Sequence, residues 1–133
     1  MKKVFVNGTF DILHRGHIEL LNYARSCGSS LHVGIDSDKR VSLMKGLERP
    51  IYTQNHRKYI LENLKAVDSV EIFSSDRELC QLIIKYKPDI MVVGSDWRRK
   101  PVIGEQYAGE LRFFERIDGY ATTKTVQSII DRR

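Results

Sequence analysis

The segment Gly8–His17, which reads Gly-Thr-Phe-Asp-Ile-Leu-His-Arg-Gly-His, decides how this chain folds. It directly follows an apolar, strand-like run and directly precedes a stretch with the periodicity of an amphipathic helix. A parallel α/β sheet binds its ligands at the carboxyl ends of its strands. A helix amino terminus at that edge offers free N–H groups and partial positive charge. The segment therefore predicts a strand–loop–helix unit whose loop handles phosphate.

Two histidines in this segment, His14 and His17, are the candidate phosphate-handling pair. Side chains three residues apart in a tight turn or first helical turn project the same way, so both imidazoles can face one point. Each imidazole can donate a hydrogen bond to a phosphate oxygen. Gly8 and Gly16 allow the backbone to approach a ligand closely. A pair of ordinary surface histidines is the alternative, but the order of strand, glycine, histidines and helix favours phosphate binding.

Strand-like and helical patterns alternate along the rest of the chain. We expect strands at 3–7, 31–36, 69–73, 89–93 and 111–114, and helices at 18–27, after a cap at Thr53, at 79–86 and around 126–130, with a polar loop between 36 and 53. This alternation predicts the α/β fold class, as one Rossmann-like domain over residues 1–133. Its core is a doubly wound parallel sheet of about five strands with right-handed crossovers.

Composition narrows the classes of function. The chain has 133 residues, the size of one domain, and no apolar run near the roughly 18 residues of a membrane helix, so we expect a cytoplasmic protein without a membrane partner. Cys27 and Cys80 lie far apart and are expected to be buried thiols on helix faces. The net charge is +5, but the basic residues are scattered among seventeen acidic ones, which favours a small anionic substrate over nucleic acid.

A second cluster, Gly94-Ser95-Asp96-Trp97, follows the fourth expected strand and should face the same crevice. Asp96 is an acceptor that could hold a ribose hydroxyl or help to place a magnesium ion. Trp97 could form one side of the pocket for the acceptor substrate or stack on a flat group. The alternative is an aspartate that begins a turn and a tryptophan that fills the core.

The third cluster spans residues 116–124 and places Arg116 before a glycine turn at Gly119, with Thr122 and Thr123 at the start of the last helix. Hydroxyl and backbone donors at a helix amino terminus suit the β- and γ-phosphates of a nucleotide, and Arg116 adds a planar, permanently charged fork. An N-capped surface helix would explain Thr122 but not the Arg-x-x-Gly-x-x-Thr-Thr arrangement.

Cations also lie in the polar stretch between the second strand and the helix after Thr53. Lys45-Gly46 and Arg49-Pro50 form a loop whose cations could close over a triphosphate, and Lys45 is the best candidate for a phosphate contact. Arg57 lies near the start of the next helix, where a surface ion pair is one interpretation of it, and an exposed Lys45 could likewise be a solvated charge.

These motifs resemble those of the nucleotidyltransferase superfamily, in particular its cytidylyltransferase branch and most closely the glycerol-3-phosphate cytidylyltransferases. The histidine element His14-Arg15-Gly16-His17 matches the family's His-x-Gly-His. Residues 94–97 resemble the family's Gly-Asp-Asp-Trp, with Ser95 in place of an aspartate. Residues 116–123 resemble Arg-Thr-x-Gly-Ile-Ser-Thr-Thr, with Ile117 and Ala121 in place of hydroxyl residues. The resemblance extends from residue 4 to residue 130.

The resemblance implies a reaction and a set of site residues. A substrate phosphate attacks the α-phosphate of CTP, which gives a CDP-alcohol such as CDP-glycerol and releases pyrophosphate, with Mg²⁺ neutralising the leaving group. The implied catalytic residues are His14, His17, Lys45 and Arg116. The implied nucleotide-binding residues are Gly8, Thr9, Phe10, Asp96, Gly119, Thr122 and Thr123 together with both histidines and Arg116. The implied acceptor-binding residues are Asp11, Arg57 and Trp97. The family also implies a homodimer.

Two other functions remain open. The loop Lys45-Gly46 with Arg49-Pro50 looks more like that of heptose-1-phosphate adenylyltransferases, which would make the enzyme an adenylyltransferase on a sugar 1-phosphate for cell-surface glycan synthesis. The Arg116 motif favours CTP instead. A nucleotide sensor without catalysis is the other possibility, but the two histidines together with Thr122 and Lys45 favour an enzyme.

Overall fold

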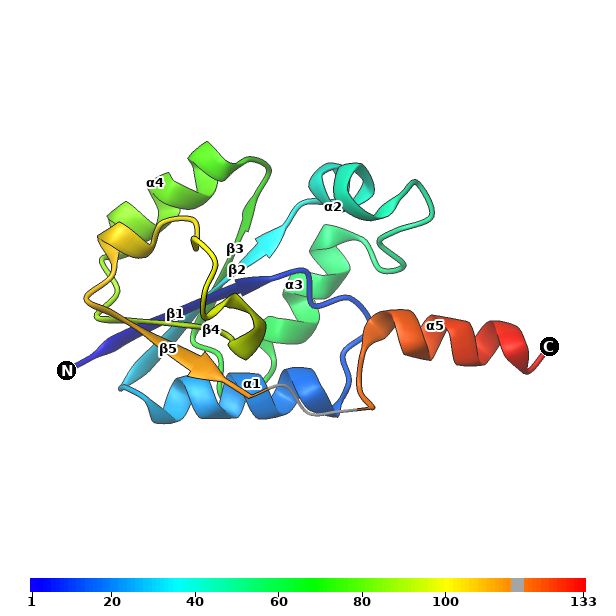
Figure 1. The fold of residues 1–133 in the computed structure, drawn as a ribbon, viewed down its shortest axis with the longest axis horizontal. Helices are drawn as coiled ribbons and strands as arrows, with labels where there is room; N and C mark the ends of the chain where they lie inside the picture. Colours follow the sequence, from blue (N-terminus) through cyan, green and yellow to red (C-terminus); the bar gives the residue numbers. More distant parts are fainter. Residues whose placement is uncertain (116–118) are drawn as a thin grey trace.

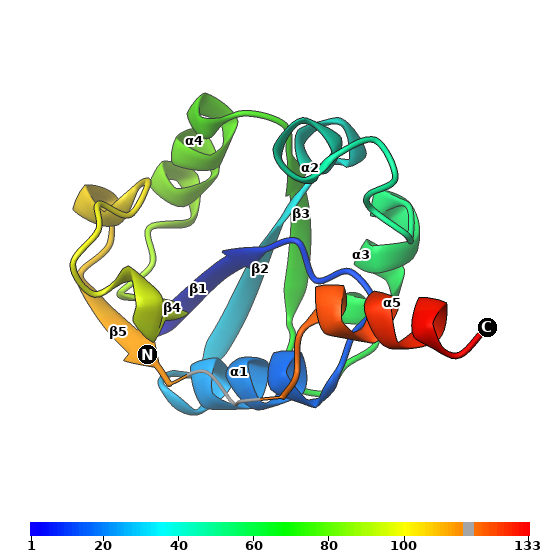
Figure 2. The same ribbon diagram turned by 45° about the vertical axis from the view of Figure 1, so that its right-hand side comes forward.

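The computed structural model describes residues 1–115 and 119–133, and it arranges them as one twisted parallel sheet with helices on both faces (Figures 1 and 2). Along the chain the elements are β1 (Lys3–Gly8), α1 (Arg15–Ser26), β2 (Ser30–Asp36), α2 (Asp38–Lys45), α3 (Gln54–Glu62), β3 (Ser69–Phe73), α4 (Asp76–Tyr86), β4 (Ile90–Gly94), β5 (Glu110–Phe114) and α5 (Thr122–Asp131), with short 3₁₀ turns at Ser95–Trp97 and Glu105–Tyr107. The predicted α/β class is confirmed.

The sheet has five strands in the order β3-β2-β1-β4-β5, and all the paired strands are parallel. From β1 the chain winds outward through β2 and β3, then returns to β4 on the other side of β1. The strand order therefore reverses between β1 and β4. In open α/β sheets such a reversal opens a crevice beyond the carboxyl ends of the strands, where ligands bind.

Two hydrophobic clusters hold the helices to the sheet. On one face, apolar side chains of β1 and β2 pack against α1 and α3, with Leu21 and Leu61 at the centre of the contact. On the other face, Phe5 and Met91 pack against Leu79 and Ile83 of α4. Figure 2 shows α4 and α1 on opposite sides of the sheet. Strand β4, an inner strand of the sheet, packs on both faces, as its apolar sequence predicts.

The last helix differs from the others because it runs away from the sheet. α5 begins near the loop after β1 and extends outward to the carboxyl terminus (Figure 1), and none of its residues is fully buried. Ile129 and Ile130 on its outer turns are exposed. Among the described residues, no helix is long and apolar enough to cross a membrane.

Three details differ from the sequence-based expectations. The polar stretch after β2 contains helix α2, which begins at a Ser37 cap whose side chain accepts from the Arg40 N–H. α1 begins at Arg15 rather than Ile18, so His14 is its N-cap and His17 lies in its first turn. Cys27 and Cys80 are free thiols that are only half-buried, so the expectation of buried thiols was wrong.

His32, in the middle of β2, gives the fold a pH-dependent stability. It is 6% exposed, packs against the Phe5 and Tyr86 rings, and contacts Ser69 through Nδ1. Burial lowers the pKa of His32, and the nearby Glu71 carboxylate partly opposes that effect. The unfolded chain therefore binds the proton more readily, so the free energy of unfolding should rise with pH from the lowered pKa to about 6.5.

Urea unfolding between pH 5 and pH 8 measures this effect. We expect the free energy of unfolding to increase across the window in the wild type and to increase less steeply in His32→Gln, whose amide does not titrate. Equal slopes in the two proteins would show that other groups cause the pH dependence.

Candidate active site

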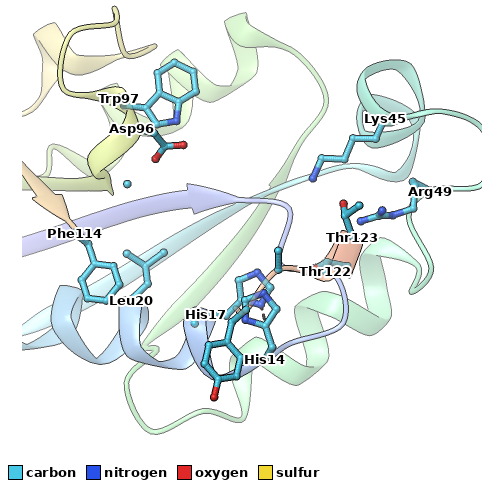
Figure 3. Close-up of a pocket in the computed structure, with 14 residues that line it drawn as sticks. His14, His17, Leu20, Lys45, Arg49, Asp96, Trp97, Phe114, Thr122 and Thr123 are labelled. Atoms are coloured by element: carbon cyan, nitrogen blue, oxygen red, sulfur yellow. Dashed lines mark hydrogen bonds between the residues drawn. The ribbon is translucent and has the colours of Figure 1, made fainter. Parts of the chain in front are cut away.

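A cavity of about 300 Å³ opens at the carboxyl edge of the sheet, at the point where the strand order reverses (Figure 3). Five separate parts of the chain line it: the start of α1, the end of α2 with the loop after it, the carboxyl end of β4, the carboxyl end of β5, and the start of α5. The lining residues are His14, Gly16, His17, Leu20, Lys45, Arg49, Gly94, Asp96, Trp97, Phe114, Tyr120, Ala121, Thr122 and Thr123. The histidine loop and the threonine-tipped last helix, which we expected to meet at one nucleotide, both line this cavity.

The two imidazoles lie against each other at one wall of the cavity. The His14 and His17 rings stack with their centroids 3.8 Å apart and an angle of 20° between their planes. The His14 backbone N–H donates to His17 Nδ1 at 3.3 Å. Because Nδ1 of His17 accepts this bond, the neutral imidazole carries its proton on Nε2, where it can donate to a ligand.

Gly16 leaves the space that this stacked pair requires. A Cβ at Gly16 would lie 2.9 Å from Cε1 and 3.0 Å from Nδ1 of the His14 ring. Contacts this short are not tolerated, so any side chain at this position would push His14 from its place. The glycine in the His-x-Gly-His element is thus explained by the packing of the first histidine.

The loop before the histidines is held in an uncommon conformation. Phe10 and Ile12 have φ angles of 51° and 49°, a region that branched and bulky residues rarely occupy. The buried Phe10 ring packs beside His17, with centroids 5.3 Å apart. The Thr122 hydroxyl donates to the Asp11 carbonyl oxygen, which ties the start of α5 to this loop. The histidine loop and the start of α5 are therefore joined directly.

The electrostatic environment of the cavity favours an anion. The amino termini of α1 and α5 both border it, and neither helix has an acidic residue in its first turn, whereas α2 and α4 do. The partial positive charge of these two termini is therefore not offset locally. The cations Lys45 and Arg49 also line the cavity, and Figure 3 shows both side chains pointing toward the start of α5.

The far side of the cavity is formed by Asp96 and Trp97, which follow β4 (Figure 3). A Cβ at Gly94 would lie 2.8 Å from the Asp96 carboxylate oxygen Oδ1, so Gly94 gives the carboxylate its space. Trp97 is 45% exposed and so does not fill the core. Among the described lining residues Asp96 is the one carboxylate, and no group of three or more possible metal ligands gathers anywhere in the described ranges.

Several residues implied by the resemblance do not line the cavity. They are Gly8, Thr9, Phe10, Asp11, Arg57 and Gly119. Arg57 is the clearest case, because its side chain is fully buried beneath the site and pairs with Asp38. Asp11 is 1% exposed, and its carboxylate accepts the backbone N–H groups of residues 51–52. Both side chains position the loops around the site in this structure, in place of the expected contact with an acceptor. The predicted role of Arg116 falls on a residue outside the described ranges.

Sequence reasoning missed three lining residues. Leu20 and Phe114 were expected only as parts of a helix face and a strand, and Tyr120 only as a position within the third motif. A signal was present for two of them: Leu20 is three residues after His17 on the same helix face, and Phe114 ends a strand at the ligand-binding edge. Tyr120 stacks on His14 with centroids 6.2 Å apart, which no sequence pattern indicates.

Together, the doubly wound sheet, the paired histidines and the cationic cavity define an enzyme of the nucleotidyltransferase class. A family model described as cytidylyltransferase-like matches residues 5–127. The chain belongs to this cytidylyltransferase-like family.

Two curated relatives are similar to this chain over nearly its whole length. The bifunctional protein HldE of Sulfurimonas denitrificans is 46% identical over 128 residues, which cover 96% of this chain and 27% of that protein. The bifunctional protein HldE of Helicobacter pylori (strain G27) is 43% identical over 128 residues, with the same coverage. The chain thus spans about a quarter of the length of these relatives.

Solved structures show the same architecture. The lipopolysaccharide core biosynthesis protein from Thermoplasma volcanium has a TM-score of 0.71 and 28% identity, and the match covers 89% of this chain and 99% of that one. Pantothenate synthetase from Thermus thermophilus has a TM-score of 0.61 at 14% identity, covering 96% of this chain and 64% of that one, which is a likeness of fold alone.

Proposed function

We propose that this chain transfers AMP from ATP to a sugar 1-phosphate such as heptose 1-phosphate and releases pyrophosphate. The observation that carries the proposal is the 42–46% identity to the HldE relatives over more than nine-tenths of the chain, which favours this substrate pair over CTP and glycerol 3-phosphate. The similarity to the lipopolysaccharide core biosynthesis protein from Thermoplasma volcanium supports a role in cell-surface glycan synthesis. So does the Lys45-Gly46 and Arg49-Pro50 loop, which resembles that of heptose-1-phosphate adenylyltransferases.

In the proposed reaction, an oxygen of the sugar phosphate attacks the α-phosphorus of ATP while the bond to the pyrophosphate oxygen breaks. The arrangement supports catalysis by positioning and charge neutralisation. His17 Nε2 and the His14 imidazole lie where they could donate to the oxygens of the α-phosphate. Lys45, Thr123 and the amino terminus of α5 are suited to hold the pyrophosphate end as negative charge builds on it.

The proposal includes Mg²⁺, which would neutralise the triphosphate when bound. The donor set of the cavity fits an ion held mainly by phosphate oxygens and water, because Mg²⁺ sites for nucleotides commonly use one or two carboxylates and the substrate's own phosphates. Asp96 is the carboxylate available for that purpose among the described lining residues.

Pyrophosphate release tests the proposal. The protein is incubated with each of ATP, CTP, GTP and UTP, in combination with heptose 1-phosphate, other sugar 1-phosphates and glycerol 3-phosphate. We expect release with ATP and a sugar 1-phosphate. Release with CTP and glycerol 3-phosphate would instead establish the cytidylyltransferase function. Nucleotide binding without release for any combination would favour a nucleotide sensor.

We further propose a homodimer, as in the family that the motifs resemble. The exposed Ile129 and Ile130 on the projecting helix α5 support it, since an amphipathic helix that extends from the domain leaves an apolar face to be covered. Sedimentation velocity at micromolar concentration is expected to show a dimer, and a monomer throughout would refute this part of the proposal.

A further inference from the structure

Arg49 places a nearly buried guanidinium at the wall of the cavity. Its side chain is 11% exposed, and its Nε has no hydrogen-bond partner among the described residues. The nearest carboxylate oxygen, Oδ2 of Asp11, is 3.9 Å from Nε, which is too far for a hydrogen bond. A guanidinium is always charged and carries five N–H donors. A buried group of this kind is destabilising unless acceptors satisfy it. Because Nε is itself buried from solvent, the part of the guanidinium that lines the cavity is the part that can meet an anionic acceptor from outside the chain.

The backbone that carries Arg49 is held in place from two sides. The Arg49 N–H donates to the Gly46 carbonyl oxygen at 3.1 Å, and the Ser42 hydroxyl donates to the Arg49 carbonyl oxygen at 2.6 Å. Directly after it, the Asp11 carboxylate accepts the N–H groups of residues 51–52 at 2.5 and 2.9 Å. Asp11 belongs to the histidine loop, so the position of Arg49 is set relative to the histidines themselves.

Arg49 therefore differs from Lys45, the other cation on this side. Lys45 is the last residue of α2, and its exposed side chain lines the cavity. A guanidinium whose position is fixed can donate two parallel hydrogen bonds to one phosphate, whereas a lysine ammonium acts as a point charge. Less side-chain entropy is lost when a ligand binds to a group that is already held in place.

We propose that Arg49 is a phosphate-binding residue of this site and that Asp11 is its positioning residue. The guanidinium donates to the oxygens of a phosphate group, either the triphosphate of the donor nucleotide or the phosphate of the acceptor. The inference rests on the proposed function only for the identity of that substrate. The nearly buried side chain, the cavity that it lines and the Asp11 anchor are observed in the structure and do not depend on the proposed function.

The test compares Arg49→Gln, Arg49→Lys, Asp11→Asn and the double variant Arg49→Gln/Asp11→Asn with the wild type. Arg77→Gln, on the exposed surface of α4, is the matched control for loss of an arginine. Isothermal titration calorimetry measures the affinity for inorganic tripolyphosphate, ATP and glucose 1-phosphate. Circular dichroism and Tm report whether each variant is folded. Arg49→Lys keeps the charge and so provides a folded comparison should Arg49→Gln be unstable.

We expect Arg49→Gln to weaken phosphate binding by about ten- to a hundredfold, the loss typical of charge-assisted hydrogen bonds, with Arg49→Lys between it and the wild type. A loss confined to tripolyphosphate and ATP assigns Arg49 to the donor, and a loss confined to glucose 1-phosphate assigns it to the acceptor. Asp11→Asn should also weaken binding, and the double variant should be no worse than Arg49→Gln, because Asp11 acts through Arg49.

A change of less than about twofold for every ligand in folded Arg49→Gln would overturn the inference. Additive losses in the double variant would overturn the positioning role of Asp11. The proposed function fails separately: a wild type that releases no pyrophosphate, but whose tripolyphosphate affinity still falls in Arg49→Gln, would leave this inference standing.

Discussion

Replacing His17 by alanine is expected to lower kcat about 100- to 1000-fold, the usual effect of removing one donor aimed at charge that develops in a transition state. The His17 ring lines the cavity and is fixed by its stack on His14 and by the hydrogen bond at Nδ1, which leaves Nε2–H as its donor. A donor held in this way needs no reorganisation during the reaction. Initial rates of pyrophosphate release, with saturating substrates, measure kcat.

Alanine also removes the acceptor for the His14 N–H, so the catalytic and structural roles of His17 need separate variants. In His17→Asn the amide oxygen can take the place of Nδ1, which keeps the start of α1 but loses the Nε2 donor. In His17→Gln the amide nitrogen can take the place of Nε2. We expect Asn to preserve Tm and lose activity as alanine does, and Gln to recover part of the activity. An Asn variant as active as the wild type would contradict the role given to Nε2.

Much of the fold could be predicted because its signals are local. Apolar runs marked all five strands to within one residue at each end, and Thr53 marked the start of α3 as an N-cap. Helix α2 was missed because only Val41 among its residues is buried, so it carries no apolar stripe. The capping residue Ser37 was its one local sign, and a single serine is too common to indicate a helix by itself.

Some residues of the candidate site could likewise be predicted from local signals, and others could not. His14, His17, Asp96 and Thr122 were predicted because each lies at a strand end or a helix start, and those positions share one edge in a parallel sheet. The roles of Asp11 and Arg57 could not be predicted. Both were expected to contact a substrate, but both are buried and bind backbone groups far away in the sequence. Such partners are decided by tertiary packing, which leaves no periodic pattern.

Loss of Arg57 is expected to destabilise the fold strongly, because its buried guanidinium connects three separate segments of the chain. Its NH1 donates to the carbonyl oxygens of Thr9 and Asp36, both at 2.9 Å. Its Nε donates to the Tyr52 carbonyl oxygen at 3.0 Å, and its NH2 pairs with Asp38 at 2.9 Å. The loop before the histidines, the end of β2 and the segment that follows Arg49 are thus joined through a single side chain.

Replacing Arg57 by methionine keeps most of the side-chain volume but removes the guanidinium donors from these three carbonyl oxygens. We expect the free energy of unfolding to fall by about 3–5 kcal/mol, the usual result of breaking a buried charged network, and Tm to fall by about 10–20 °C for a domain of this size. Urea and thermal unfolding followed by circular dichroism measure both.

Arg77→Met, on the exposed face of α4, should change stability by no more than about 0.5 kcal/mol. Asp38→Asn should cost less than Arg57→Met, since the Asp38 side chain is 41% exposed and can be solvated. If Arg57→Met were as stable as the control, the three loops would have to be held by their other contacts, and the positioning role of Arg57 would be wrong.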